Sequence, residues 1–214
     1  MNVTVFEAIN ITKKYRNTLA LNQVSMSVMQ GDIYGFIGEN GAGKTTMIRL
    51  LTGLAEPTTG KIALFGESNK KLAKQRERIG CIIESPSLYL DMTAYENLEV
   101  QRLQRGIPGK GCIDNALALV GLKDTGKKKA KDFSLGMRQR LALAIALLGN
   151  PEFLVLDEPI NGLDPTGIIE LRNLLKRLNK ERGITILISS HILTELHQLA
   201  NRYGICLLYT SDAA

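Results

Sequence analysis

One segment constrains the fold of this chain more than any other: residues 38–45 read GENGAGKT, which fits the pattern G-x-x-x-x-G-K-[ST]. The apolar run Asp32–Ile37 precedes it and predicts a strand, and the pattern Thr45–Leu51, ended by Gly53, predicts a helix. A glycine-rich loop between a strand and a helix lets main-chain N–H groups converge on phosphate oxygens, and the helix N-terminus adds its positive dipole end. The segment therefore predicts a nucleotide-binding α/β fold.

Two side chains of this loop carry its chemistry. We expect the Lys44 ammonium group to bind the β- and γ-phosphates and to act in catalysis, and the Thr45 hydroxyl to ligate Mg²⁺. The predicted nucleotide-binding residues of the loop also include Gly38, Asn40, Gly41, Ala42, Gly43 and Thr46.

A second motif supplies acids. Phe153–Leu156 is an apolar run, typical of a buried strand, and it ends in Asp157 and Glu158. A nucleotide hydrolase needs a carboxylate at the end of a neighbouring strand to hold Mg²⁺, and we assign this role to Asp157. Glu158 is predicted to polarise the attacking water. Strands often end in solvated acids, so it is the phosphate loop that makes this pattern persuasive.

The rest of the chain indicates a P-loop NTPase core of class α/β with three parts. Strand patterns at Val3–Ile11 and Ala20–Val28 predict an antiparallel start. From about residue 90 to residue 148 strand patterns vanish, which predicts an inserted α-helical subdomain. Strands and amphipathic helices alternate elsewhere, which predicts a mainly parallel sheet covered on both faces. The expected elements are strands at 61–65, 79–83, 153–156, 185–188 and 203–208, and helices at 69–77, 168–178 and 192–200.

With these motifs in this order, the chain resembles the ATP-binding subunits of ABC transporters from about Val5 to Ile205. The resemblance implies further site residues. Tyr15, just before the first hairpin, would stack on adenine; Glu84 occupies the place of a glutamine that contacts Mg²⁺ and water; and Ser134 and Gly136, in the segment FSLGM, take the place of the family's signature. Asp164 in the segment NGLD would couple two sites, and His191 would hold the γ-phosphate.

The resemblance also implies partners. In the family, the signature segment completes the site of an opposite subunit, so two ATP molecules are held in a head-to-tail dimer. We therefore expect ATP and Mg²⁺ as cofactors, a homodimer, and a separately encoded polytopic membrane permease. The segments around Glu84 and the signature are similar to subunits of bacterial exporters of bacitracin and lantibiotic peptides. The chain departs from the commoner family pattern at Glu84, Leu135 and Met137, and none of these changes removes an indispensable donor.

Charge leaves an alternative open. Lys and Arg number 27 against 21 Asp and Glu, a net charge of +6 that suits a nucleotide, a nucleic acid or an anionic membrane face. The alternative function is an ABC-type ATPase switch that acts in regulation or on nucleic acid. Aromatic residues are only 5% and Trp is absent, so nucleic acid is the less favoured partner. A P-loop kinase or GTPase is disfavoured because no Asn-Lys-x-Asp motif is present.

The remaining expectations concern location and the ends of the chain. No apolar run approaches the roughly 20 residues that span a bilayer, so any membrane spans would belong to the permease. Cys81, Cys112 and Cys206 have no metal-binding spacing and suit reduced thiols in the cytoplasm. The resemblance implies that the permease would hold the protein peripherally on the inner face of the membrane. We expect one ATP-binding domain at 1–205, with the helical subdomain at about 90–148, and a non-native or truncated tail at 206–214.

Overall fold

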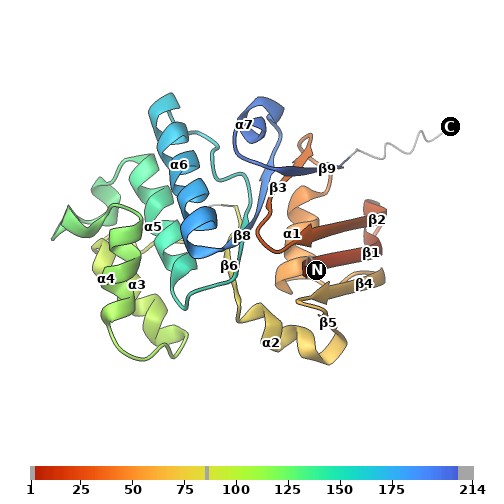
Figure 1. Ribbon diagram of the computed structural model, residues 1–214, viewed down its shortest axis with the longest axis horizontal. Coiled ribbons are helices and arrows are strands. Elements are labelled where there is room, and N and C mark those ends of the chain that lie inside the picture. Colours follow the sequence, from red (N-terminus) through yellow and green to blue (C-terminus); the bar gives the residue numbers. More distant parts are fainter. Residues whose placement is uncertain (1–2, 85–86, 207–214) are drawn as a thin grey trace.

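The chain folds around two sheets in the computed structural model, which describes residues 3–84 and 87–206 (Figure 1). The first sheet is antiparallel and has the order β2-β1-β4-β5, in which β1 (Thr4–Tyr15) and β2 (Thr18–Met29) form a long hairpin. The other two strands of this sheet are β4 (Thr59–Leu64) and β5 (Glu67–Ser68). The predicted antiparallel start is therefore confirmed.

The second sheet is parallel and contains the strands that carry the chemistry. Its order is β6-β7-β8-β3-β9, and every described pairing between neighbouring strands is parallel. Parallel strands place their carboxyl ends at one edge, so loops distant in sequence meet there. The strands are β6 (Ile79–Ile82), β7 (Phe153–Leu156), β8 (Thr185–Ser190), β3 (Ile33–Gly38) and β9 (Arg202–Cys206).

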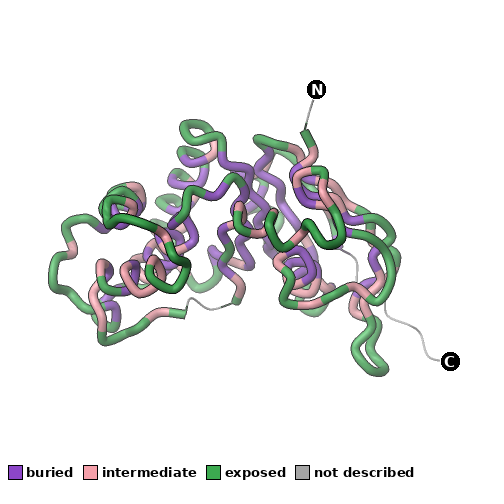
Figure 2. The backbone as a smooth tube through the Cα atoms, turned by 90° about the horizontal axis from the view of Figure 1, so that it is seen from below, coloured by how far each residue is buried: buried purple, intermediate pink, exposed green. Residues whose placement is uncertain are grey.

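The parallel sheet is buried on both faces, as its apolar strands require. Alternate residues of β7 point to opposite faces: Phe153 and Val155 pack with α1 (Lys44–Thr52) and the antiparallel sheet, whereas Leu154 and Leu156 pack with the helical part of the chain. The side chains of β8 alternate in the same way, and Leu187 packs on the face with α1 and the antiparallel sheet. Figure 2 shows the buried segments gathered in the middle of the molecule and exposed segments at its outer ends.

The inserted helical subdomain lies on the side of the molecule opposite the antiparallel sheet (Figure 1). It comprises α3 (Ala94–Gln104), α4 (Gly111–Leu119) and α5 (Leu135–Leu147), with 3₁₀ turns at Lys123–Thr125 and Ala130–Asp132. Helix α6 (Pro165–Arg182) contributes Leu171, Leu174, Leu175 and Leu178 to the same core. The predicted helical insertion is therefore confirmed.

Several predicted boundaries are wrong. The hairpin strands extend to Tyr15 and Met29, so Tyr15 ends the first strand, opposite Thr18, instead of preceding the hairpin. The helix predicted at 69–77 is a 3₁₀ turn, Asn69–Lys71, followed by the short α2 (Leu72–Arg76). The helix predicted at 192–200 is only α7 (Leu193–His197). Pairing between the two hairpin strands extends them into their polar ends. Helix α7 has five residues and buries one of them, Leu196, so further turns would add little stability.

The end of the chain is described only in part. Cys206 is the last residue of β9 and pairs with Gly38, so it lies in the parallel sheet. The remainder of the predicted tail, 207–214, lies outside the described residues. Across the described ranges, no helix has both the length and the apolar character needed to cross a bilayer.

One buried amide joins the segment after β6 to the helical subdomain. Asn97 in α3 is 1% exposed, and its Oδ1 accepts a 2.8 Å hydrogen bond from the Tyr89 main-chain N–H. Its Nδ2 donates to the carbonyl oxygens of Tyr89 at 3.0 Å and Thr93 at 2.9 Å. The side chain therefore gives the Tyr89 N–H its partner and adds a second hydrogen bond to carbonyl oxygens that already accept main-chain N–H groups.

We expect Asn97→Ala to lower the free energy of unfolding by about 2 kcal/mol, because it removes the hydrogen bonds of a buried side chain and leaves the Tyr89 N–H without its partner. Urea unfolding measures this loss. Asn115→Ala, at an exposed position of α4, is the control and should change the value by less than about 0.5 kcal/mol. Equal effects of the two substitutions would contradict the assignment.

Candidate active site

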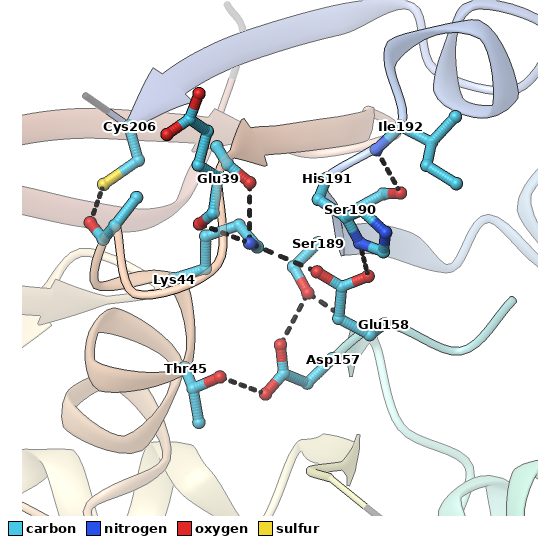
Figure 3. Close-up of polar contacts among 12 residues, drawn as sticks. Glu39, Lys44, Thr45, Asp157, Glu158, Ser189, Ser190, His191, Ile192 and Cys206 are labelled. Carbon is cyan, nitrogen blue, oxygen red and sulfur yellow. Dashed lines mark hydrogen bonds and ion pairs between the residues drawn. The ribbon is translucent and has the colours of Figure 1, made fainter. Parts of the chain in front are cut away.

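The phosphate loop connects β3 to α1 at the carboxyl edge of the parallel sheet (Figure 3). Helix α1 begins at Lys44, and no side chain caps it, so the first-turn N–H groups of Lys44, Thr45 and Thr46 have no partner within the helix. These free donors and the helix dipole make the loop suited to an anion.

Glycine is required at the turn into this helix. Gly43 has a φ of 93°, in the left-handed region, and a Cβ added there would lie 2.5 Å from the Ala20 carbonyl oxygen of β2. Any other residue would therefore push the loop away from β2 as well as strain the main chain.

Lys44 is the buried cation of the site, with 5% of its surface exposed. Its Nζ donates hydrogen bonds to the carbonyl oxygens of Gly38 at 2.7 Å and Glu39 at 3.0 Å. The same nitrogen lies 3.2 Å from Oε1 of Glu158 (Figure 3). The ammonium group is thus already directed into the space between the loop and the acids.

Asp157 lies directly after β7, as the sequence predicts, and contacts the loop. The Thr45 hydroxyl donates a 2.7 Å hydrogen bond to Oδ2 of Asp157. A hydroxyl and a carboxylate at this distance are hard oxygen ligands of the type Mg²⁺ binds. Within the described residues no group of three or more His, Cys, Asp or Glu side chains could hold a metal. The two oxygens of Thr45 and Asp157 fit an ion that takes its other ligands from phosphates and water.

The Glu158 carboxylate lies next to two side chains from other parts of the chain. Oε2 lies 2.9 Å from Nδ1 of His191, which follows β8 (Figure 3). Oε1 is buried and has no hydrogen-bond partner, with Lys44 as its nearest cation. Glu158 has a φ of 49°, an unusual conformation for a side-chain-bearing residue, which points to a position held by its surroundings.

Ser189 also belongs to this cluster, although it is absent from the predicted site residues. It lies in β8 and is fully buried; its hydroxyl donates to Oδ1 of Asp157 at 2.6 Å and accepts the Glu158 N–H at 2.9 Å. The signal for it was the polar pair Ser189-Ser190 at the end of an apolar run, the same pattern that marks Asp157.

Glu84 has a partner other than the expected one. Its carboxylate forms an ion pair with Arg49 of α1, and its φ is 60°. Both side chains are partly exposed, so the pair is accessible to water and weak. Sequence reasoning missed Arg49, since nothing in the local pattern separates it from other surface cations.

The signature and the 161–164 segment lie against each other within this chain. The Ser134 hydroxyl caps α5 by accepting the Met137 N–H at 3.2 Å, and Asp164 caps α6 by accepting the Gly167 N–H at 3.1 Å. A Cβ added at Gly162 would lie 3.2 Å from Cδ2 of Leu135. The capping oxygens are therefore engaged with their own helices.

The predicted residues thus fall into two groups. The structure brings together Lys44, Thr45, Asp157, Glu158 and His191. In the part of the chain that the structure describes, no hydrogen bond or ion pair connects Tyr15, Ser134, Gly136 or Asp164 to that group. Tyr15 is 41% exposed, and the Lys13 ammonium group lies over its ring, 4.8 Å from the ring centroid.

Comparison with known sequences gives consistent relatives. Residues 21–161 match the family model described as ABC transporter. The bacitracin transport ATP-binding protein BcrA of Bacillus licheniformis is 51% identical over 203 residues, which are 94% of this chain and 66% of that protein. The lantibiotic transport ATP-binding protein SrtF of Streptococcus pyogenes is 44% identical over 195 residues, which are 91% of this chain and 83% of that protein. The chain therefore spans slightly less than two thirds of the length of BcrA.

A solved structure shares the fold. The ATP-binding cassette MJ0796, a dimer in a post-hydrolysis state bound to ADP and Pi, superposes with a TM-score of 0.81. It is 25% identical, and the match covers 96% of this chain and 97% of that chain. The α/β fold with two sheets and a helical insertion is therefore that of a known nucleotide-binding cassette.

We expect Gly43→Ala to lower ATP affinity at least about tenfold, because the added Cβ displaces the phosphate loop from Ala20. Isothermal titration measures the affinity, and urea unfolding measures the accompanying loss of stability. Gly31→Ala is the matched control: Gly31 also has a positive φ, 83°, but a Cβ there meets nothing within 4 Å. Similar effects of both substitutions on affinity would contradict the close approach as the cause.

Proposed function

Because the chain belongs to the ABC transporter family, we propose that it is the ATP-binding and ATP-hydrolysing subunit of a transporter whose membrane-spanning permease is a separate chain. The observation that carries the proposal is the buried Lys44, which joins the phosphate loop to Glu158 at 3.2 Å. A buried cation beside uncapped N–H donors favours a polyphosphate, and the adjacent carboxylate favours hydrolysis of it.

In the proposed binding step, the N–H groups of the loop and of the first turn of α1 bind the phosphates. Lys44 exchanges the carbonyl oxygens of Gly38 and Glu39 for phosphate oxygens. Thr45 and Asp157 are the residues that would hold Mg²⁺, which neutralises phosphate charge when bound. Glu84 joins them only after its ion pair with Arg49 breaks. Tyr15, exposed at the end of β1, is the proposed adenine contact.

In the proposed hydrolytic step, Glu158 accepts hydrogen bonds from the attacking water and orients it toward the γ-phosphate. His191, 2.9 Å from Glu158, holds the γ-phosphate and keeps the carboxylate in place. Lys44 stabilises the charge that develops on the transferred group. Lys44 and His191 both lie next to the Glu158 carboxylate, which supports a joint role for the three side chains in one step.

We propose a homodimer because part of the predicted site is far in sequence from the phosphate loop and is not joined to it within one chain. Ser134 and Gly136 lie at the start of α5, where the N–H groups of Leu135 and Gly136 have no partner within the helix and could bind an anion. A two-fold dimer would place this helix start on the ATP of the other copy, with Asp164 between the two sites. The dimeric state of the structural relative MJ0796 supports this arrangement.

The proposed cargo is a peptide antibiotic or a similar drug-like molecule, exported from the cell. The names of the relatives BcrA and SrtF, which refer to bacitracin and lantibiotic transport, support it. The protein would then lie on the cytoplasmic face of the membrane, held there by its permease.

Glu158→Gln should bind ATP with nearly unchanged affinity, hydrolyse it at least about a hundredfold more slowly, and form a stable dimer with Mg²⁺ and ATP. The amide keeps the shape of the side chain but cannot accept the proton of water. Phosphate release and size-exclusion chromatography measure the two effects. Lys44→Ala is the matched control and should neither bind ATP nor dimerise; rapid hydrolysis by Glu158→Gln would remove Glu158 from its role.

The transport proposal predicts that the chain co-purifies with a polytopic membrane protein from its own cells. Affinity capture in mild detergent, followed by mass spectrometry, tests this. The matched control is capture with ATP and vanadate, which should alter the amount of partner retained. Salt-sensitive binding of nucleic acid, with no membrane partner, would instead favour the regulatory switch.

A further inference from the structure

One buried hydroxyl connects the two acids of the site. Ser189 lies in β8, with none of its surface exposed, opposite the end of β7 where Asp157 and Glu158 begin. Its hydroxyl proton goes to Oδ1 of Asp157 at 2.6 Å, and its oxygen accepts the main-chain N–H of Glu158 at 2.9 Å (Figure 3). A serine hydroxyl has one proton to donate, so its donor is fully used here and its direction is fixed.

The hydrogen bond from Ser189 gives the second oxygen of the Asp157 carboxylate a partner. Thr45 holds Oδ2 at 2.7 Å and Ser189 holds Oδ1 at 2.6 Å, so each oxygen has one protein partner. With both oxygens bonded, the carboxyl plane cannot rotate about its terminal torsion without losing a hydrogen bond. Partners of this kind orient the ligands of a metal and raise its affinity.

The bond to Glu158 acts on the main chain. Glu158 has a φ of 49°, which costs free energy for any residue with a Cβ, and the following Pro159 limits its choices further. This conformation aims the carboxylate at Lys44 and His191. Ser189 binds the N–H of this strained residue, so one hydroxyl holds both the orientation of Asp157 and the direction of Glu158.

We propose that Ser189 is a positioning residue for ATP hydrolysis, which aligns Asp157 with the metal and Glu158 with the attacking water. The proposal rests on the proposed function, because it assigns Ser189 a role in that same reaction. Ser189 does not touch the reacting atoms; it acts through the two acids. Loss of the Ser189 hydroxyl should therefore slow hydrolysis and lower the affinity for Mg²⁺, while Lys44 keeps its phosphate contacts.

Ser189→Ala in the full chain tests this. We expect kcat to fall about ten- to a hundredfold while KM for ATP changes less than about threefold. A second readout does not depend on turnover: the Mg²⁺ concentration at half of the ATP-induced rise in Tm should increase about tenfold. The rise in Tm with ATP alone, in EDTA, should stay as in the parent chain.

Thr185→Val is the matched control. Thr185 lies in the same strand, is 1% exposed, and its hydroxyl accepts the Gly31 N–H at 3.0 Å, at the end of β8 away from the acids. It should lower the free energy of unfolding but leave kcat and the Mg²⁺ midpoint unchanged. If both variants lose stability and keep the parental kcat, Ser189 has a structural role alone and the inference is overturned.

Ser189→Cys provides the same test if the alanine variant does not fold. The thiol nearly preserves the shape of the side chain but is a weak donor and acceptor, so kcat and the Mg²⁺ midpoint should move in the same directions. An unchanged kcat in this variant overturns the inference. Failure of the parent chain to bind or hydrolyse ATP is a different result, because it contradicts the proposed function before any substitution at Ser189 is made.

Discussion

The ion pair between Lys44 and Glu158 is the contact around which the site is organised. A lysine that is 5% exposed needs compensation for the water it has lost, and it finds it in two carbonyl oxygens of its own loop and in one carboxylate. The contact also joins two motifs that are more than a hundred residues apart. Because its carbonyl partners are main-chain groups of the loop itself, a phosphate can replace them without unfolding anything around it.

The parallel sheet makes this contact possible. β3, β7 and β8 are neighbours or next neighbours, and each ends at the same edge with a residue of the site. Their alternating side chains fill two separate cores, one toward α1 and the antiparallel sheet and one toward α5 and α6. Strands held from both faces cannot shift in register without exposing apolar side chains, so the polar residues at their ends keep fixed positions. The rigidity of the site is therefore a consequence of the burial of the sheet.

The contacts of the described residues separate the predicted site residues into two sets. The phosphate loop and both acids form one cluster, whereas Ser134 and Asp164 cap their own helices. Leu135 lies close to Gly162, so the start of α5 lies beside the segment before α6. This arrangement is consistent with a site that two copies of the chain complete together.

The sequence alone predicted the loop, the position of the two acids after a buried strand, most strands of the two sheets, and the helical insertion. These features are local, since glycines, apolar periods and charged strand ends depend on residues close together in the chain. Tertiary structure decided which polar groups pair. Several features depend on a partner from another element. They are the contacts of Ser189 with Asp157, of Arg49 with Glu84 and of Asn97 with Tyr89, and the full length of the hairpin. Such pairing is set by the packing of buried elements. A polar residue at the end of an apolar run marks Ser189 as a candidate, but the local sequence does not show which residue of another element it will contact.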